Sequence, residues 1–382
     1  MRSHRSGLTA VVGFSVLLIV GVLFPQTADA QIPKRYQEAV DKSRKIIAAT
    51  MTTQKIPGLS VAVAVDGKIV WSEGFGFADL ENNLKVTPAT RFRIASVSKP
   101  ITAAAMARLY DQGKLDLDAP VQKYVPEFPS KGVVITARQL AGHLSGIRHL
   151  RRDPDLEKDE FYNRKTYCRN VSEGVSRFQA DPLDFVPGTK FGYSSKGFVL
   201  LSAMLERISG QDYPGLLQKE VFSPLGMLNT GPDDNRQIIP NRSRFYSLDA
   251  NKTVINAQYI DQSCDWAGGG LLSTSEDLVR FGSAHLQSGF LKQDTLRQMF
   301  TSQKTPDGKE TGTGLGWRVN HDKEGRLYYY HPGENVGGRS YLWVYPQEKV
   351  VVAMIHNVTG AHLGSIVDIS RQFVEVQQSP NE

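Results

Sequence analysis

Ser96 and Lys99 are the two residues of this chain whose types and spacing point most directly to chemistry. They lie three positions apart in the stretch RIASVSKPIT, residues 93–102, so on a helix their side chains share a face. A serine hydroxyl needs a neighbouring base to act as a nucleophile, and a lysine amine is a base only where burial or a nearby positive charge lowers its pKa. The apolar residues beside Lys99 favour that interpretation. The alternative is an ordinary helix start, because a Ser-x-x-Lys pattern arises about once by chance in such a chain.

Tyr193 is the second candidate, and it precedes two serines in the stretch FGYSSKGFVLL, residues 191–201. This stretch predicts a short loop followed by a helix. A neighbouring cation is expected to ease the loss of the phenol proton, so that Tyr193 could act as an acid or a base. The alternative is a half-buried aromatic residue of the core.

The third candidate segment is YYYHPGENVGG, residues 328–338. We predict a strand that ends in His331-Pro332-Gly333, followed by a glycine-rich turn. Gly333 allows the backbone to approach a ligand closely. The main-chain N–H of Glu334 could then join that of Ser96 as an oxyanion hole for acyl transfer. The alternative is that His331 faces solvent at the end of its strand.

In this order, the three segments resemble the motifs of the serine β-lactamase and penicillin-binding superfamily. That superfamily carries S-x-x-K, then Y-x-N or S-x-N, then K-T-G or H-x-G. The stretches AGHLSGI (141–147) and AGGGLLSTSEDLVRF (267–281) are similar to segments of its class C-like branch. The third motif is closest to the esterase and mitochondrial β-lactamase-like serine protease members. The resemblance covers roughly residues 35–375.

The resemblance implies a serine hydrolase that acts through an acyl-enzyme on ester or amide substrates, either peptide or β-lactam-like. It implies no cofactor and no metal. A D,D-peptidase, a weak β-lactamase, and a non-catalytic binding or assembly protein of the same fold are the alternatives. Whether Lys99 or Tyr193 deprotonates Ser96 stays open. The implied catalytic residues are Ser96, Lys99 and Tyr193, and the implied oxyanion and substrate-binding residues are the Glu334 backbone, His331, Gly333 and Ser195.

Two departures from the superfamily pattern concern the substrate. Ser195 stands where the pattern has asparagine, and a hydroxyl cannot copy the donor-plus-acceptor geometry of an amide. His331 replaces the lysine of K-T-G, and a histidine is mostly neutral at pH 7, so it holds a substrate carboxylate less firmly. Both departures argue against an efficient β-lactamase.

The elements that must position these residues come from both ends of the chain. Two β-rich runs flank Asp66-Gly67, which predicts a hairpin over residues 59–76. The expected fold class is α+β, with an antiparallel sheet built from both chain ends, flanked by terminal helices, and an inserted helical subdomain. A ligand site is expected between the two parts. The predicted strands span 326–331, 339–346 and 349–357, the predicted helices span 33–55, 101–115, 196–210, 275–289 and 362–378, and the two parts span 31–96 with 315–382 and about 97–314.

The first thirty residues have the pattern of a signal peptide. Arg2 and Arg5 precede a mostly apolar run, and Ala28-Asp29-Ala30 places small residues where a signal peptidase cleaves. We expect cleavage before Gln31 and a periplasmic or secreted protein; a retained membrane anchor is the alternative. Cleavage lowers the net charge from +6 to +5, because two arginines and one aspartate are removed.

Charge patterning and the remaining polar residues add expectations about partners. The remaining charges form no basic stripe, so we expect a small-molecule or peptide substrate rather than a nucleic acid. The oligomeric state is left open. Cys168 and Cys264 are the only cysteines, and a disulfide between them and two separate thiols are equally consistent with the sequence. His143 and His149 are interpreted as structural, and the charged segment 148–170 as a solvated loop or a lid.

Overall fold

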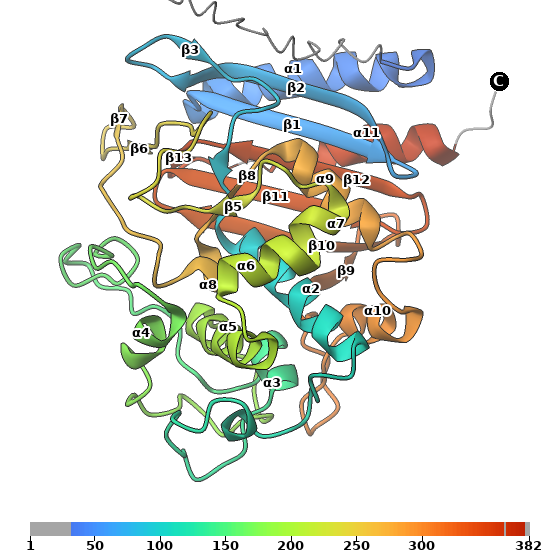
Figure 1. Cartoon of the computed structure of the whole chain (residues 1–382). Coiled ribbons are helices and arrows are strands. Elements are labelled where there is room, and N and C mark those ends of the chain that lie inside the picture. Colours follow the sequence, from blue (N-terminus) through green and yellow to red (C-terminus); the bar gives the residue numbers. More distant parts are fainter. Residues whose placement is uncertain (1–31, 363, 379–382) are drawn as a thin grey trace, which may run out of the picture. The chain divides into compact units, whose positions relative to one another are not determined.

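A seven-stranded antiparallel sheet is built from the two ends of the described chain (Figure 1). The computed structural model describes residues 32–362 and 364–378, and the predicted signal peptide lies outside them. The strand order is β3-β2-β1-β12-β11-β10-β9, which confirms the predicted α+β class and the contribution of both ends. The strands are β1 (Gly58–Val65), β2 (Lys68–Asp79), β3 (Leu84–Lys85), β9 (Arg318–His321), β10 (Leu327–Asn335), β11 (Gly338–Tyr345) and β12 (Val350–His356).

The centre of the sheet, β1 paired with β12, is buried along its whole length. Successive residues of a strand face opposite sides, so Ala62 and Ala64 face one apolar cluster while Val61 and Val63 face another. Both faces are therefore covered, which explains why β1 and β12 are almost continuously apolar. The predicted hairpin is confirmed, and its turn places Asp66 and Gly67 at φ 49° and 76°, as a two-residue turn requires.

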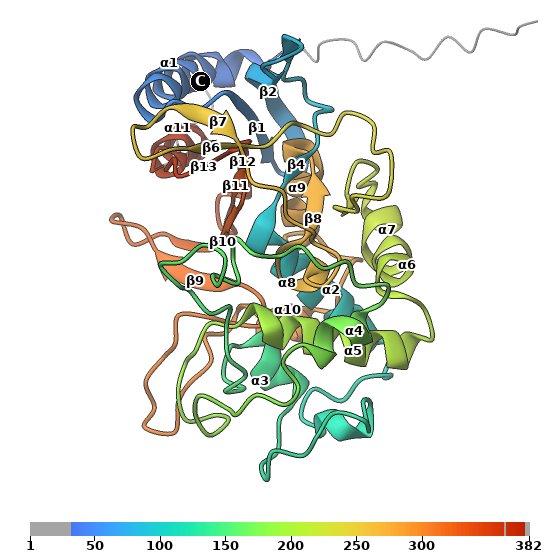
Figure 2. The same ribbon diagram turned by 90° about the vertical axis from the view of Figure 1, so that its left-hand side faces the viewer.

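The terminal helices cover one face of the sheet and α9 covers the other (Figure 2). Phe373 of α11 stacks on Trp71 of β2, with ring centroids 5.9 Å apart. Gly282 of α9 lies so close to the sheet that an added Cβ would sit 2.6 Å from Val351. The helices are α1 (Gln37–Gln54), α9 (Ser275–Ala284) and α11 (Ile366–Gln378).

The middle of the chain consists of helices joined by long loops, with α5 and α2 at its centre. It also contributes short strands to two three-stranded sheets. The predicted division of the chain into two parts at about residues 97 and 314 stays a prediction. Helix α9 lies within the predicted helical part, yet it packs on the large sheet. The helices are α2 (Ser98–Asp111), α3 (Ala137–Ala141), α4 (Val171–Ser176), α5 (Ser195–Ser209), α6 (Tyr213–Leu217), α7 (Ser223–Leu225), α8 (Trp266–Gly269) and α10 (Gln293–Phe300).

The short elements complete the connections around the large sheet. None of the helices in the described ranges is both long and apolar enough to cross a bilayer. The short strands are β4 (Phe92–Arg93), β5 (Gly231–Pro232), β6 (Tyr246–Leu248), β7 (Val254–Asn256), β8 (Leu271–Ser273) and β13 (Val358–Thr359), and the remaining turns are η1 (Lys34–Tyr36), η2 (Ala95–Val97), η3 (Val121–Lys123) and the π-helical η4 (Gln218–Phe222).

Strand β10 corrects one prediction, because it does not end at His331-Pro332-Gly333. It continues to Asn335, and the turn to β11 follows at Val336-Gly337. The strand tolerates Pro332 because β9 pairs with β10 only as far as Tyr330. Beyond that point β10 has β11 as its one neighbour, and a proline is accepted at such an edge.

Candidate active site

Ser96 and Lys99 lie where the turn η2 passes into helix α2. Ala95, directly before Ser96, has a φ of 48°, in the left-handed region that costs an L-residue roughly 1–2 kcal/mol. The side chain of Lys99 is fully buried, whereas that of Ser96 is partly exposed. The Nζ atom of Lys99 lies 3.1 Å from the Oγ atom of Ser96. The structure therefore brings a buried amine to an accessible hydroxyl.

The Lys99 amine has two further partners from distant parts of the chain. Its Nζ atom lies 3.0 Å from Ser195 Oγ and 2.5 Å from the carbonyl oxygen of Gly268. Burial lowers the pKa of Lys99 well below its usual value of 10.5; Asp265 opposes this shift, and Arg318 adds to it. A neutral amine has two N–H groups and one lone pair. It can donate to Gly268 and Ser195 and still accept the proton of the Ser96 hydroxyl.

The first turn of α5 holds Tyr193 and Ser195 in place. Ser194 is the N-cap, and its Oγ atom accepts from the N–H of Gly197. The main-chain N–H groups of Ser194 and Ser195 donate to the Nδ1 atoms of His143 and His149, each at 3.1 Å. The two histidines therefore support the tyrosine-serine segment. This agrees with their predicted structural role and adds a specific function to it.

The ring of Tyr193 is enclosed by the Lys99 amine and two imidazole groups. Lys99 Nζ lies 4.7 Å from its centroid, and the ring centroids of His143 and His149 lie 4.4 and 5.1 Å away. Burial raises the pKa of Tyr193 to about 12, and a hydrogen bond with Ser96 and the charge of Arg318 only partly oppose this. The neighbouring charge thus acts in the predicted direction, but the net shift of the Tyr193 pKa is the opposite of the predicted one. Desolvation outweighs the cation, and Tyr193 keeps its proton.

His331 is buried rather than solvent-facing, with 2% of its surface exposed. Its Nδ1 atom lies 2.7 Å from the carbonyl oxygen of Pro332, so the ring donates from Nδ1. Burial lowers its pKa well below 6.5, and the charges of Lys99 and Arg318 add to this. A neutral imidazole therefore occupies the position beside Tyr193, with the two ring centroids 6.3 Å apart.

Gly333 lets β10 press against the turn that carries Ser96. An added Cβ would lie 2.4 Å from the carbonyl oxygen of Ile94 and 3.0 Å from the Cβ of Ala95. The next residue, Glu334, directs its carboxylate to Arg339, 2.5 Å away. The Glu334 side chain is thus engaged by Arg339, and the oxyanion role of its main chain stays a prediction.

The chain is similar to known proteins over most of its length. The family described as Beta-lactamase matches residues 44–372. The chain belongs to the β-lactamase family. It is 35% identical over 411 aligned residues to the human serine beta-lactamase-like protein LACTB, mitochondrial, an alignment that covers 85% of this chain and 75% of the relative.

Solved structures of this family share the fold. An octameric penicillin-binding protein homologue from Pyrococcus abyssi superposes with a TM-score of 0.74 at 25% identity, over 87% of this chain and 76% of that one. A D-stereospecific amidohydrolase from Streptomyces superposes with a TM-score of 0.72 at 25% identity, over 90% of this chain and 99% of that one. The family of this chain therefore includes hydrolases of acyl groups.

Gly268 and Asp265 belong to the site but were not predicted as site residues. Gly268 lies in the glycine-rich stretch after Asp265, and an added Cβ would lie 2.9 Å from the carbonyl oxygen of Ser195. That close approach allows the Gly268 carbonyl to reach Lys99. The glycine run AGGG was the available signal, but nothing in it shows which carbonyl turns toward which amine.

The segment 148–170 is tied down next to Asp265. Cys168 and Cys264 form a disulfide with Cα atoms 5.0 Å apart, which settles the alternative that the sequence left open. Arg164 donates to the side chains of Gln262 and Asn335. The base of the segment is thus fixed to the residues before α8, while residues 154–158 are exposed. Whether the exposed part acts as a lid stays a prediction.

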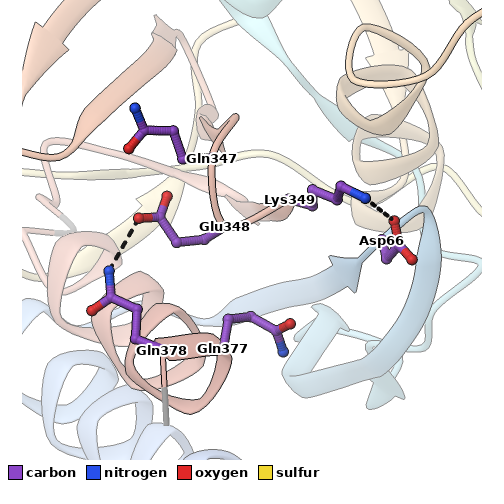
Figure 3. Close-up of a pocket in the computed structure, with 6 residues that line it drawn as sticks. All are labelled: Asp66, Gln347, Glu348, Lys349, Gln377 and Gln378. Carbon is purple, nitrogen blue, oxygen red and sulfur yellow. Dashed lines mark hydrogen bonds and ion pairs between the residues drawn. The ribbon is translucent and has the colours of Figure 1, made fainter. Parts of the chain in front are cut away.

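A surface pocket of about 360 Å³ is lined by none of the proposed site residues; Figure 3 shows the residues that line it. It is formed by the β1–β2 turn, the β11–β12 turn and the end of α11. It holds no pairing of a hydroxyl with a base, and the Lys349 ammonium already contacts Asp66 at 3.1 Å. In the described residues, no group of three or more histidine, cysteine, aspartate or glutamate side chains is arranged to hold a metal.

Proposed function

We propose that the protein is a serine hydrolase in which Ser96 attacks the carbonyl of an ester or amide and forms an acyl-enzyme. The observation that carries this proposal is the 3.1 Å contact between Ser96 Oγ and the buried Nζ of Lys99. A lysine whose pKa is lowered by burial supplies the neutral amine that a serine nucleophile needs.

In the first step, the Ser96 oxygen bonds to the substrate carbonyl carbon while its proton passes to Lys99. Burial favours Lys99 over Tyr193 as this base, because it shifts both pKa values toward the neutral forms. A neutral lysine can accept a proton, whereas a neutral tyrosine can only give one. We therefore propose Lys99 as the base, the alternative that this pKa argument supports.

In the second step, the bond from the carbonyl carbon to the leaving group breaks, and Tyr193 gives its proton to the departing atom. The ammonium of Lys99, above the Tyr193 ring, returns a proton to the phenol oxygen. Water then adds to the acyl-enzyme, its proton passes to Lys99, and Ser96 leaves with that proton. Each half-reaction therefore restores Tyr193 as the acid and Lys99 as the neutral base.

The developing oxyanion is assigned to the main-chain N–H groups of Ser96 and Glu334. The support is the close packing at Gly333, which places β10 against the Ser96 turn. Two fixed N–H donors at the point where negative charge develops stabilise the tetrahedral intermediate.

The proposed substrates are esters and amides, including peptides, rather than penicillins or cephalosporins. Neutral His331 offers no charge from β10 to a β-lactam carboxylate. Ser195 accepts from Lys99, and its single hydroxyl cannot copy the donor-plus-acceptor geometry that an asparagine amide offers to a substrate amide. A substrate panel of a chromogenic ester, a cell-wall pentapeptide and a cephalosporin would rank the hydrolase, D,D-peptidase and β-lactamase alternatives.

A fluorophosphonate probe tests the proposed nucleophile. Peptide mass analysis should find the adduct on Ser96, and the Ser96→Ala variant should remain unlabelled. Ser98→Ala is the matched control, because Ser98 is a buried serine two residues away that bonds to Ala95 and Leu271; it should still be labelled. A folded wild-type protein without an adduct would favour a non-catalytic binding or assembly role.

We also propose that the protein is exported after removal of residues 1–30. The N-terminal pattern supports this, and the Cys168–Cys264 disulfide fits an oxidising compartment. Comparison of the mature N-terminus in cell fractions tests it.

A further inference from the structure

Arg164 joins the segment 148–170 to two other segments beside the proposed active site. Its two terminal nitrogens donate to the side chains of Gln262 and Asn335, and the Asp265 carboxylate lies 3.9 Å from the same guanidinium. Gln262 and Asp265 precede α8, whereas Asn335 is the last residue of β10. One side chain therefore connects three segments that lie far apart in the sequence.

The contacts of Arg164 are almost closed to solvent. Only 11% of its side chain is exposed, and Gln262 and Asn335 are 0% and 2% exposed. A buried charge is costly unless its hydrogen bonds are made, and a guanidinium presents its N–H donors in a fixed planar fork. The two amide side chains are therefore held relative to each other by a rigid group.

Asn335 extends this link to the turn that carries Ser96. Its Oδ1 atom accepts from Arg164 and from the main-chain N–H of Val336. Its Nδ2 atom is thereby directed to the carbonyl oxygen of Gly269, 3.0 Å away. An added Cβ on Gly269 would lie 3.9 Å from the main-chain nitrogen of Ser96. The guanidinium is therefore linked through one amide side chain to the main chain beside the proposed nucleophile.

The backbone groups assigned to the reaction are the direct neighbours of this network. Glu334, whose N–H is a proposed oxyanion donor, precedes Asn335 in β10. Gly268, whose carbonyl oxygen binds Lys99, precedes Gly269 in α8. A displacement of the Asn335 side chain would therefore affect both groups.

We propose that Arg164 is a positioning residue for acyl transfer, which holds the end of β10 and the α8 segment where the reaction requires them. The proposal rests on the hydrolase function, because the groups that Arg164 positions are those assigned to that reaction. A positioning role predicts a loss in kcat with little change in KM, since the displaced groups act mainly in the transition state. A purely structural role predicts lower stability without a selective fall in kcat.

Hydrolysis of 4-nitrophenyl acetate by Arg164→Ala tests the proposal. This variant should lower kcat about tenfold or more, as the loss of a buried charged hydrogen bond does. Guanidinium chloride at roughly 50 mM, far below the molar concentrations that unfold proteins, should restore part of kcat to Arg164→Ala and should not raise that of the wild type. Methylammonium should not restore it, because an ammonium cannot reproduce the planar fork.

Arg326→Ala is the matched control. Arg326 has the same side-chain exposure of 11% and pairs with Asp322 and Glu324 in the β9–β10 turn. Its loss should lower the free energy of unfolding, leave kcat unchanged and give no response to guanidinium. Equal falls in kcat for the two alanine variants, or a fall in Arg164→Ala that guanidinium does not reverse, would overturn the proposal.

Two further variants test the geometry and the route. Arg164→Lys keeps the charge without the fork, so it should show the same selective fall in kcat even where the alanine variant does not fold. Asn335→Ala should also lower kcat, and adding Arg164→Ala to it should cost little more, because both substitutions remove one contact. Additive losses would reject the route through Asn335.

Amide hydrogen exchange separates this proposal from the hydrolase function. Peptides that cover residues 262–270 and 331–338 should exchange about tenfold faster in Arg164→Ala than in the wild type, and Arg326→Ala should leave them unchanged. If the wild type does not hydrolyse the ester, the hydrolase proposal fails for it, and the exchange rates alone decide whether Arg164 holds the two segments. Unchanged exchange in Arg164→Ala would reject the positioning role even in an active hydrolase.

Discussion

The Nδ1 atom of His149 accepts the main-chain N–H of Ser195 at a distance of 3.1 Å. His143 does the same for the preceding residue, Ser194. The first N–H groups of a helix have no partner within it, so the two imidazoles satisfy the start of α5. They can do so only while Nδ1 is unprotonated, and burial, the main cause, lowers the pKa of His149 to about 4.

The His149–Ser195 contact gives the first prediction. His149→Leu should lower the free energy of unfolding by about 1–3 kcal/mol, since it leaves a buried N–H without an acceptor. It should also lower ester turnover, because Ser195 would no longer hold Lys99. His149→Asn keeps an acceptor and should recover part of both losses. Urea unfolding and kcat/KM measure the effects, with the exposed His321→Leu as the control. Equal behaviour of the Leu and Asn variants would contradict the proposed positioning role.

The second prediction concerns the pH dependence of acylation. The neutral amine of Lys99 is the proposed base, so kcat/KM should fall as the pH drops through the pKa of Lys99, well below 10.5. Asp265→Asn removes a charge that favours the ammonium, so the acidic limb should move to lower pH. Arg318→Gln should move it to higher pH. Lys99→Ala should cost roughly 10²–10⁴-fold at every pH.

The pH–rate profile of a neutral ester measures these shifts. Asp307→Asn is the control, because it removes one negative charge from an exposed loop and should leave the limb unmoved. If Asp265→Asn and Arg318→Gln shifted the limb in the same direction, the electrostatic account of Lys99 would be wrong.

Gly333 provides the third prediction. Gly333→Ala would bring a methyl group to 2.4 Å from both the Ile94 carbonyl oxygen and Ser340 Oγ, so either β10 or the Ser96 turn must move. The overpacking should cost about 1–3 kcal/mol, and the displaced turn should lower kcat more than KM rises. Gly231→Ala is the matched control, because Gly231 is also in a strand and no atom lies within 4 Å of an added Cβ. Full activity of Gly333→Ala would remove the argument for a close β10–Ser96 approach.

The sequence was sufficient for the parts of the fold that depend on local patterns. Asp66-Gly67 predicted the hairpin, and the apolar runs at both chain ends predicted strands that form one sheet. The Ser96–Lys99 spacing predicted that the two side chains lie together, because residues three apart share a face where the chain is helical, and the junction of η2 and α2 keeps that geometry.

The residues that set the chemistry depend on contacts between distant segments. The carbonyl that binds Lys99 belongs to Gly268, which is 169 positions away, and no spacing rule links the two. Arg318 was missed because β9 has only four residues, too few to show an alternating pattern. The direction of the Tyr193 pKa was wrong because it depends on how far the ring is buried, which one segment does not reveal.

The disulfide carries the fourth prediction. Cys168 and Cys264 are 96 residues apart, so the bond restricts a long loop of the unfolded chain. Replacing both with serine should lower the free energy of unfolding by about 2–4 kcal/mol. Because Cys264 directly precedes Asp265 and α8, turnover should also fall. Thermal unfolding and kcat/KM in the presence and absence of a reductant check both effects. The double variant itself is the control, since a reductant should not affect it.

The last prediction is that stability falls as the medium becomes acidic, because several histidines are buried in neutral form. His285 lies among Phe281, Phe290 and Trp317, and burial lowers its pKa from 6.5 to about 4. Below pH 6.5 the unfolded chain binds a proton at this residue that the folded protein does not bind until about pH 4. Stability must therefore decrease as the pH falls across that window.

For His285 alone, the loss between pH 8 and pH 5 should be about 2 kcal/mol. His285→Leu, similar in size and unable to ionise, should reduce the loss of the whole protein by that amount. His321→Leu should not change it, because His321 is exposed. Urea unfolding at both pH values gives the comparison. A His285→Leu protein as acid-sensitive as the wild type would show that this buried imidazole is not a source of the acid sensitivity.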